Sequence, residues 1–88
     1  MTTGDSHWTF HRGRLGEALN RWRSKNPSAE SQRLVDEFLM DLVGDPFACG
    51  EQDGTSGVWT GLPGNRIVVV YVPNPPAREI VVADINFR

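Results

Sequence analysis

Residues 64–88 read GNRIVVVYVPNPPAREIVVADINFR, and this stretch decides the fold because it holds the two strongest apolar runs of the chain. Both runs, 66–72 and 79–87, are rich in valine and isoleucine, and the segment between them is rich in proline. Branched aliphatic residues favour strands, and proline favours turns. The stretch therefore predicts an antiparallel β-hairpin.

Each strand of this hairpin has two faces, because successive side chains of a strand point to opposite sides. We expect the face without charges to meet the helices, since an unpaired charge is costly to bury. This face consists of Ile67, Val69, Tyr71, Val81, Ala83, Ile85 and Phe87. The other face carries Val68, Val70, Val72, Ile80 and Val82, together with the polar residues Arg66, Asp84, Asn86 and Arg88.

A polar cluster is predicted at one end of that other face. With a turn centred near Pro75, Arg66 is expected opposite Asp84, with Asn86 and Arg88 beside them. The cluster would lie next to the strand that carries Trp59. A cross-strand ion pair between Arg66 and Asp84 is the plainer interpretation, and a binding site is the functional one.

The sequence before the hairpin predicts a strand and two helices. HWTFH, residues 7–11, alternates as a short strand does. Apolar residues then recur at helical spacing from about 14 to 25 and again up to Gly44, with the interruption Asn26-Pro27-Ser28 between the two stretches. Two consecutive amphipathic helices form a helical hairpin that needs an apolar surface to cover.

Residues 44–57 are polar and glycine-rich, which predicts a mobile loop, and VWTGL at 58–62 predicts a further short strand. The expected fold class is α+β, with one domain over residues 1–88. Its element order is β-α-α-β-β-β, with the helical hairpin packed on one face of a small antiparallel sheet.

Composition restricts the classes of function. Nine basic and eleven acidic residues give a net charge of −2, which disfavours an obligate nucleic-acid binder. The single cysteine, Cys49, excludes an internal disulfide and is interpreted as an inert thiol. His7 and His11 lie too far apart on a strand to share a metal ion. We expect no metal, no cofactor, no membrane partner and a cytoplasmic location.

The element order, the strands GNRIVVVYV and VVADINFR, and the LVGDP stretch at 42–46 resemble the RelE/ParE superfamily of bacterial toxins. In RelE-like members, one arginine at the entry to the third strand and another after the fourth bind messenger RNA phosphate in the ribosomal decoding site. Arg66 and Arg88 fall on these two places. The resemblance therefore implies that Arg66 and Arg88 are catalytic and bind the substrate, and the predicted polar cluster adds Asn86 and Trp59 as candidate substrate-binding residues.

Three functions remain open. The first is a toxin that a cognate antitoxin neutralises, and that acts by ribosome-dependent mRNA cleavage or by inhibition of DNA gyrase. The second is a non-catalytic member of the same fold that serves as a protein-binding module. It is favoured because the second strand carries Val58, Trp59 and Thr60 instead of lysines, and because no histidine or tyrosine follows the fourth strand. The third is an unrelated small α+β domain that forms a homodimer through its apolar sheet.

Overall fold

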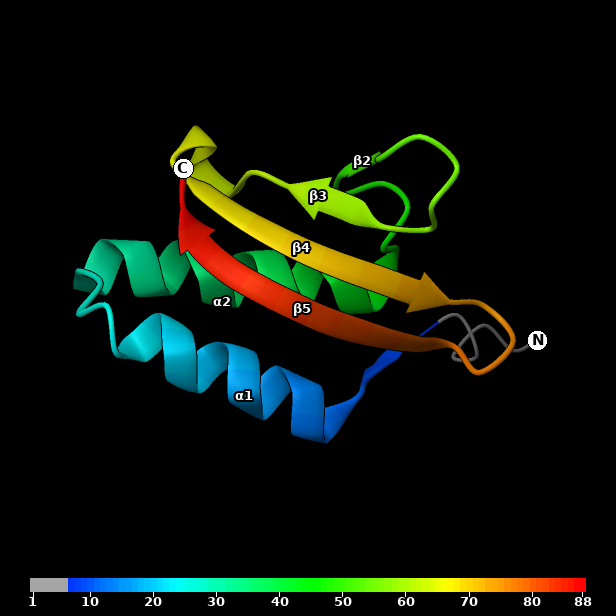
Figure 1. Ribbon diagram of the computed structural model, residues 1–88, viewed down its shortest axis with the longest axis horizontal. Coiled ribbons are helices and arrows are strands. Elements are labelled where there is room, and N and C mark those ends of the chain that lie inside the picture. The colour runs from blue at the N-terminus through cyan, green and yellow to red at the C-terminus, as the bar shows by residue number, and fades with distance from the viewer. Residues whose placement is uncertain (1–6) are drawn as a thin grey trace.

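The computed structural model describes residues 7–88. This part of the chain has an α+β fold, with two α-helices and a five-stranded mixed sheet (Figure 1). The helices are α1 (Arg12–Arg23) and α2 (Ala29–Gly44). The strands are β1 (Thr9–Phe10), β2 (Glu51–Gln52), β3 (Trp59–Gly61), β4 (Ile67–Asn74) and β5 (Glu79–Phe87), with a short 3-10 turn, η2 (Pro63–Asn65), before β4.

Both predicted helices are present, and each begins at a capping side chain. His11 Nδ1 accepts a hydrogen bond from the Arg14 amide at 3.2 Å, and Ser28 Oγ accepts one from the Ser31 amide at 3.1 Å. Such caps satisfy amide groups that the first helical turn leaves free. Neither helix of residues 7–88 has the combination of length and apolar character that crossing a bilayer demands.

The strands follow one another across the sheet in the order β1-β5-β4-β3-β2. β1 runs parallel to β5, while the other neighbours are antiparallel. The prediction of a purely antiparallel sheet is therefore wrong at this edge, because β1 and β5 are joined by a long connection that includes both helices, and no tight turn between them requires an antiparallel pairing. The segment predicted as a loop also contains a strand, since Glu51 and Gln52 pair with Thr60 and Trp59.

The pairing of β4 with β5 contains a β-bulge. Val70 pairs with Asp84 and Tyr71 pairs with Val82, so Ala83 has no partner on β4. An extra residue reverses the alternation of side chains beyond it. The predicted inner face is therefore wrong for Val81 and Ala83. Ile80 and Val82 take their places and are fully buried, together with Ile67, Val69, Tyr71 and Ile85.

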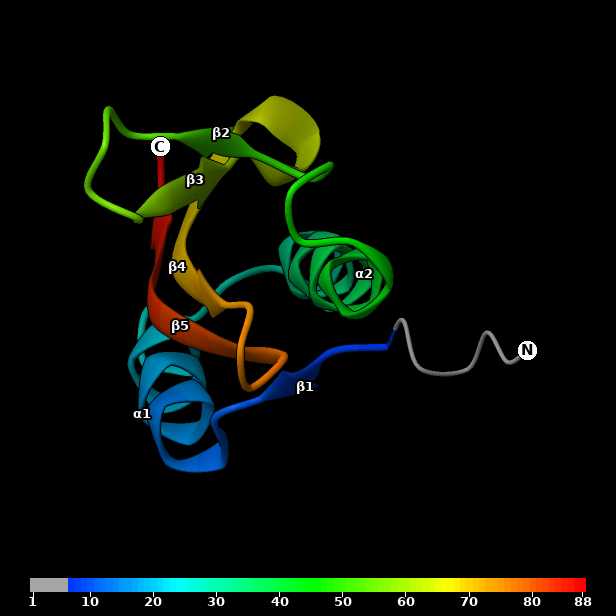
Figure 2. The same ribbon diagram turned by 90° about the vertical axis from the view of Figure 1, so that its right-hand side faces the viewer.

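α2 lies across one face of the sheet, and α1 lies alongside β5 (Figure 1). Figure 2 shows that no helix of residues 7–88 covers the opposite face of β4. The buried side chains of α1 are Ala18 and Trp22, and those of α2 are Val35, Phe38, Leu39 and Leu42. The open face carries Val68, Val70 and Val72, which are half-buried.

Candidate functional site

The two arginines singled out by the sequence lie together at one end of the sheet. β4 begins immediately after Arg66 and β5 ends immediately before Arg88. Because these strands are antiparallel, the beginning of one lies beside the end of the other. The Arg88 amide donates a hydrogen bond to the Arg66 carbonyl oxygen at 3.0 Å. The backbone of the fold therefore brings the two residues side by side.

The Arg66 side chain is directed toward the helices. Its Nη1 lies 3.9 Å from Glu30 Oε2, and the two side chains are 60% and 63% exposed. An ion pair this exposed and this long contributes little to stability, because water screens it. The guanidinium group therefore remains accessible to another anion.

The expected pairing of Arg66 with Asp84 is wrong, because Asp84 pairs with Val70 instead. The register differs from the expected one because the turn occupies residues 75–78 and is closed by a hydrogen bond from the Arg78 amide to the Pro75 carbonyl oxygen at 3.1 Å. This turn is centred later in the chain than a turn around Pro75 would be. Arg66 consequently lies beside Arg88 rather than beside a carboxylate of β5.

Asn65 holds the Arg88 side chain in place. Arg88 Nη1 donates to Asn65 Oδ1 at 2.5 Å and to the Asn65 carbonyl oxygen at 3.3 Å. Asn65 has a φ of 59°, in the left-handed region that asparagine tolerates better than most residues. Sequence reasoning missed both Asn65 and Glu30 as members of this site. The Pro-Gly-Asn sequence at 63–65 indicates a turn at the entry to β4 and could have pointed to Asn65. Nothing in the sequence connects Glu30 with Arg66.

The other two predicted binding residues contact groups other than the arginine pair. Asn86 is opposite Val68 on the open face, and its Nδ2 donates to Asp84 Oδ2 at 3.4 Å. Trp59 is opposite Tyr71, so it belongs to the inner face. The strand that carries Trp59 is next to β4, as expected, but Trp59 pairs with Tyr71 rather than with the beginning of β4, where Arg66 lies.

Trp59 belongs instead to a row of three aromatic rings. Its ring centroid is 5.3 Å from that of Phe47, which in turn is 5.5 Å from that of Trp8. Both contacts are edge-to-face, the geometry that aromatic quadrupoles favour. The row connects the residue before β1, the segment after α2, and β3, so its role is packing between distant parts of the chain.

The chemistry of the arginine pair is anion binding. A guanidinium group donates parallel hydrogen bonds that match the oxygens of a phosphate or carboxylate, and it stays protonated at any physiological pH. The partners found around the pair are Glu30 and Asn65. Neither is a buried acid or base of the kind that proton transfer at neutral pH requires.

Cys49 and His11 show structural roles. Cys49 Sγ donates to the Asp45 carbonyl oxygen at 3.2 Å. Burial, followed by the charges of Asp41 and Asp45, raises the pKa of the Cys49 thiol, which disfavours the reactive thiolate. His11 caps α1. Within residues 7–88 no three His, Cys, Asp or Glu side chains are grouped closely enough to hold a metal ion.

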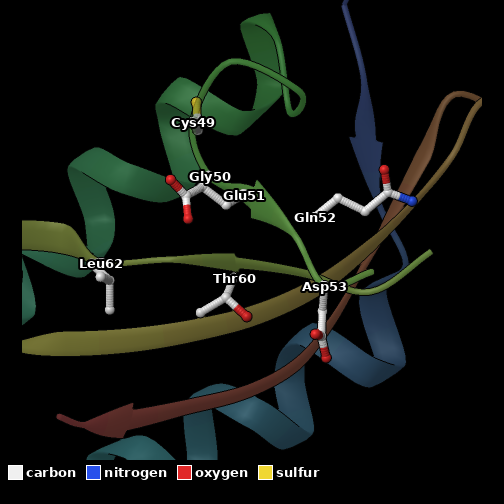
Figure 3. A pocket seen from close by; sticks show the side chains of 7 residues that line it. All are labelled: Cys49, Gly50, Glu51, Gln52, Asp53, Thr60 and Leu62. Atoms are coloured by element: carbon white, nitrogen blue, oxygen red, sulfur yellow. The ribbon is translucent and has the colours of Figure 1, made fainter. Parts of the chain in front are cut away.

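Two surface hollows are lined by residues other than Arg66 and Arg88. One, of about 490 Å³, is formed at β2 and β3 by residues that include Glu51, Asp53, Thr60 and Leu62 (Figure 3). The other, of about 150 Å³, lies between α2 and η2, and its lining includes Asp41 and Pro63. Carboxylates and apolar side chains line both hollows, and no basic side chain does.

Comparison with known proteins identified no relative of this chain. No protein-family model matches the sequence, and no significant match occurs among curated proteins or solved structures.

Proposed function

We propose that the chain is the toxin of a bacterial type II toxin–antitoxin pair, with a RelE/ParE-like fold, and that it acts in the cytoplasm until a cognate antitoxin neutralises it. The observation that carries the proposal is the contact between the Arg66 and Arg88 backbones, at 3.0 Å, at the ends of neighbouring antiparallel strands. The order strand, two helices and antiparallel strands supports it as well.

The arginine pair supplies the chemistry that such a toxin needs. Cleavage of RNA beside a 2′-hydroxyl builds negative charge on the phosphate, and guanidinium groups fixed beforehand stabilise that charge. On a ribosomal target, Arg66 and Arg88 would hold the scissile phosphate of mRNA. On DNA gyrase, the same residues would contact an acidic surface, and no proton transfer would be needed.

A protein-binding module is the second candidate, and a specific observation favours it. Each polar side chain of the predicted cluster has a partner within the fold: Arg66 has Glu30, Arg88 has Asn65, and Asn86 has Asp84. The open face beside them is lined by valines, which suit an apolar segment of another protein. In this case the chain would bind a partner without inhibiting growth.

Expression in bacteria from a tightly repressed promoter tests the proposal. We expect the wild-type chain to arrest growth, and Arg66→Ala or Arg88→Ala to relieve the arrest. Removal of one donor to a transition-state oxyanion costs roughly 100- to 1000-fold in rate. Arg23→Ala is the matched control, because Arg23 is an exposed arginine of α1 outside the site, and it should arrest growth as the wild type does.

The fate of the transcripts identifies the target. Cuts in mRNA at codon-spaced positions indicate a ribosome-dependent nuclease. Arrest with intact transcripts and induced DNA-damage signalling indicates gyrase. Normal growth on expression of the folded wild-type chain would overturn the toxin proposal and favour the protein-binding module.

A further inference from the structure

The charges of this chain are strongly segregated along the sequence. Residues 34–65 contain no lysine, arginine or histidine, so all nine basic residues lie outside this segment. The acidic residues of the segment are Asp36, Glu37, Asp41, Asp45, Glu51 and Asp53. The segment forms most of α2, then β2, β3 and the turn before β4, and its carboxylates therefore give one region of the molecule a negative potential.

Exposed apolar side chains occur in the same segment. Of the large apolar residues that the structure shows as exposed, Met40, Phe47 and Leu62 lie within it, and Phe87 alone lies outside. Leu62 is 44% exposed and lines the larger hollow, while its neighbour Pro63 lines the smaller one. The Leu62-Pro63 step therefore contributes one residue to each of two hollows, of about 490 and 150 Å³.

Carboxylates stand on both sides of this step. Figure 3 shows Leu62, Thr60 and Asp53 in a row along the larger hollow, with Glu51 beside Thr60. Asp41 lines the smaller hollow. We call the surface made by Leu62 and these three carboxylates, Asp41, Glu51 and Asp53, the acidic groove.

Among residues 7–88, no ion pair joins a basic side chain to a carboxylate of the acidic groove. The ion pairs formed among residues 7–88 are Arg33–Glu37 and Arg66–Glu30, and neither involves one of its carboxylates. An exposed apolar residue between unpaired charges of one sign fits a partner that carries an apolar side chain between charges of the opposite sign. A nucleic acid or an acidic peptide would be repelled.

We propose that the acidic groove binds a basic segment of a partner protein. An apolar side chain of the segment would rest on Leu62, and lysine or arginine residues on either side of it would reach Asp41 in one direction and Glu51 and Asp53 in the other. None of the four residues of this surface is Arg66, Arg88 or one of their partners Glu30 and Asn65, so the inference does not depend on the function proposed for the arginine pair.

Titration of the isotope-labelled protein with a blocked peptide, Lys-Lys-Leu-Lys-Lys, tests the inference by NMR. Backbone amide shifts should concentrate at residues 37–41, 51–53 and 60–64. Binding should weaken as salt is raised, because screening acts on exposed charges. A peptide with glutamate in place of lysine should not bind, and one with serine in place of leucine should bind less tightly.

Two double variants distinguish peptide binding at the acidic groove from a general electrostatic attraction between the peptide and the protein. Glu51→Gln with Asp53→Asn should weaken peptide binding about tenfold, the effect of losing roughly two exposed charge contacts. Glu17→Gln with Glu79→Gln removes the same charge elsewhere and should change the affinity less than twofold. Leu62→Ser should weaken binding while leaving the salt dependence unchanged.

Three results would overturn the inference. One is an absence of shifts at millimolar peptide, and another is an equal loss of affinity in both double variants. The third is a set of shifts that appears on raising the protein concentration alone and disappears in Glu51→Gln with Asp53→Asn, because the occupant would then be a second copy of this chain. Amide spectra of each variant without peptide verify that it is folded.

Discussion

Replacing Gly61 by alanine is expected to lower the free energy of unfolding by about 2 to 3 kcal/mol, since overpacking a well-filled core typically costs this much. Gly61 is a buried residue of β3, and a Cβ atom at this position would overlap the ring of Phe38 on α2. The Phe38 ring has little freedom to retreat, because its other neighbours include Tyr71, at a centroid distance of 6.0 Å. Glycine therefore sets how closely α2 approaches the sheet.

The expected loss is large for a domain of this size. A chain of 88 residues has a total stability of roughly 4 to 13 kcal/mol. The midpoint of thermal unfolding, followed by circular dichroism, should therefore fall by about 10 to 20 °C. The matched control is Gly16→Ala on α1, where a Cβ atom meets nothing within 4 Å. This substitution should raise stability by about 0.5 to 1 kcal/mol, because glycine is unfavourable within a helix.

A double variant identifies the clash as the cause. Phe38→Leu shortens the side chain that meets the new Cβ atom, so Gly61→Ala should cost less in that background than in the wild type. The expected coupling free energy is about 1 kcal/mol or more. If the two losses simply add, the effect of Gly61→Ala arises from strand geometry and the close approach of α2 is not its source.

The helices and the hairpin were predictable because their signals are local. The apolar stripe that ends in Leu42 repeats at helical spacing, and Ser28 and Gly44 mark the ends of α2. The apolar runs on either side of Pro75 would form strands however the rest of the chain is arranged. An antiparallel hairpin also places its outer ends side by side, which is why the proximity of Arg66 and Arg88 was correctly expected.

The contacts between particular side chains were not predictable, because they depend on the register between neighbouring strands. Every residue from Ile80 to Ala83 is apolar, so either phase of alternation gives an apolar inner face, and the bulge at Ala83 leaves no mark in the sequence. Because the turn contains four residues, 75–78, the register between β4 and β5 differs from the expected one, and Asp84 does not lie opposite Arg66. The pairing of Arg66 with Glu30 depends on how α2 is placed over η2, which no local pattern encodes.

Raising the pH from 10 to 12 is expected to destabilise the protein through Tyr71, which is the only tyrosine of the chain. Tyr71 is fully buried, and its hydroxyl donates to the Pro46 carbonyl oxygen at 2.7 Å. Burial, followed by the charges of Cys49 and Asp45, raises the pKa of Tyr71 from 10.0 to about 12. The phenol is therefore kept neutral where an exposed tyrosine would already be ionised.

The sign of the effect follows from proton binding. Between pH 10 and 12 the unfolded chain loses the phenol proton and the folded chain keeps it, so unfolding is favoured as the pH rises. The stability contributed by Tyr71 is complete well below pH 10, is lost at up to about 1.4 kcal/mol per pH unit between pH 10 and 12, and has fallen by about 2.7 kcal/mol in total once the pH is well above 12. Urea unfolding at a series of pH values measures this slope.

Tyr71→Phe is the variant that isolates the phenol. It should flatten most of the slope and should also cost about 1 to 3 kcal/mol at neutral pH, because the Pro46 carbonyl oxygen loses its buried donor. A smaller slope should remain from Cys49, whose pKa is raised as well, and Cys49→Ser should remove it. Because the chain has one tyrosine, the phenolate absorbance of the folded protein reports Tyr71 alone. Phenolate that appears near pH 10 while the protein is still folded would contradict the prediction. It would show that the Tyr71 hydroxyl is accessible to water and that its hydrogen bond to Pro46 does not keep it neutral.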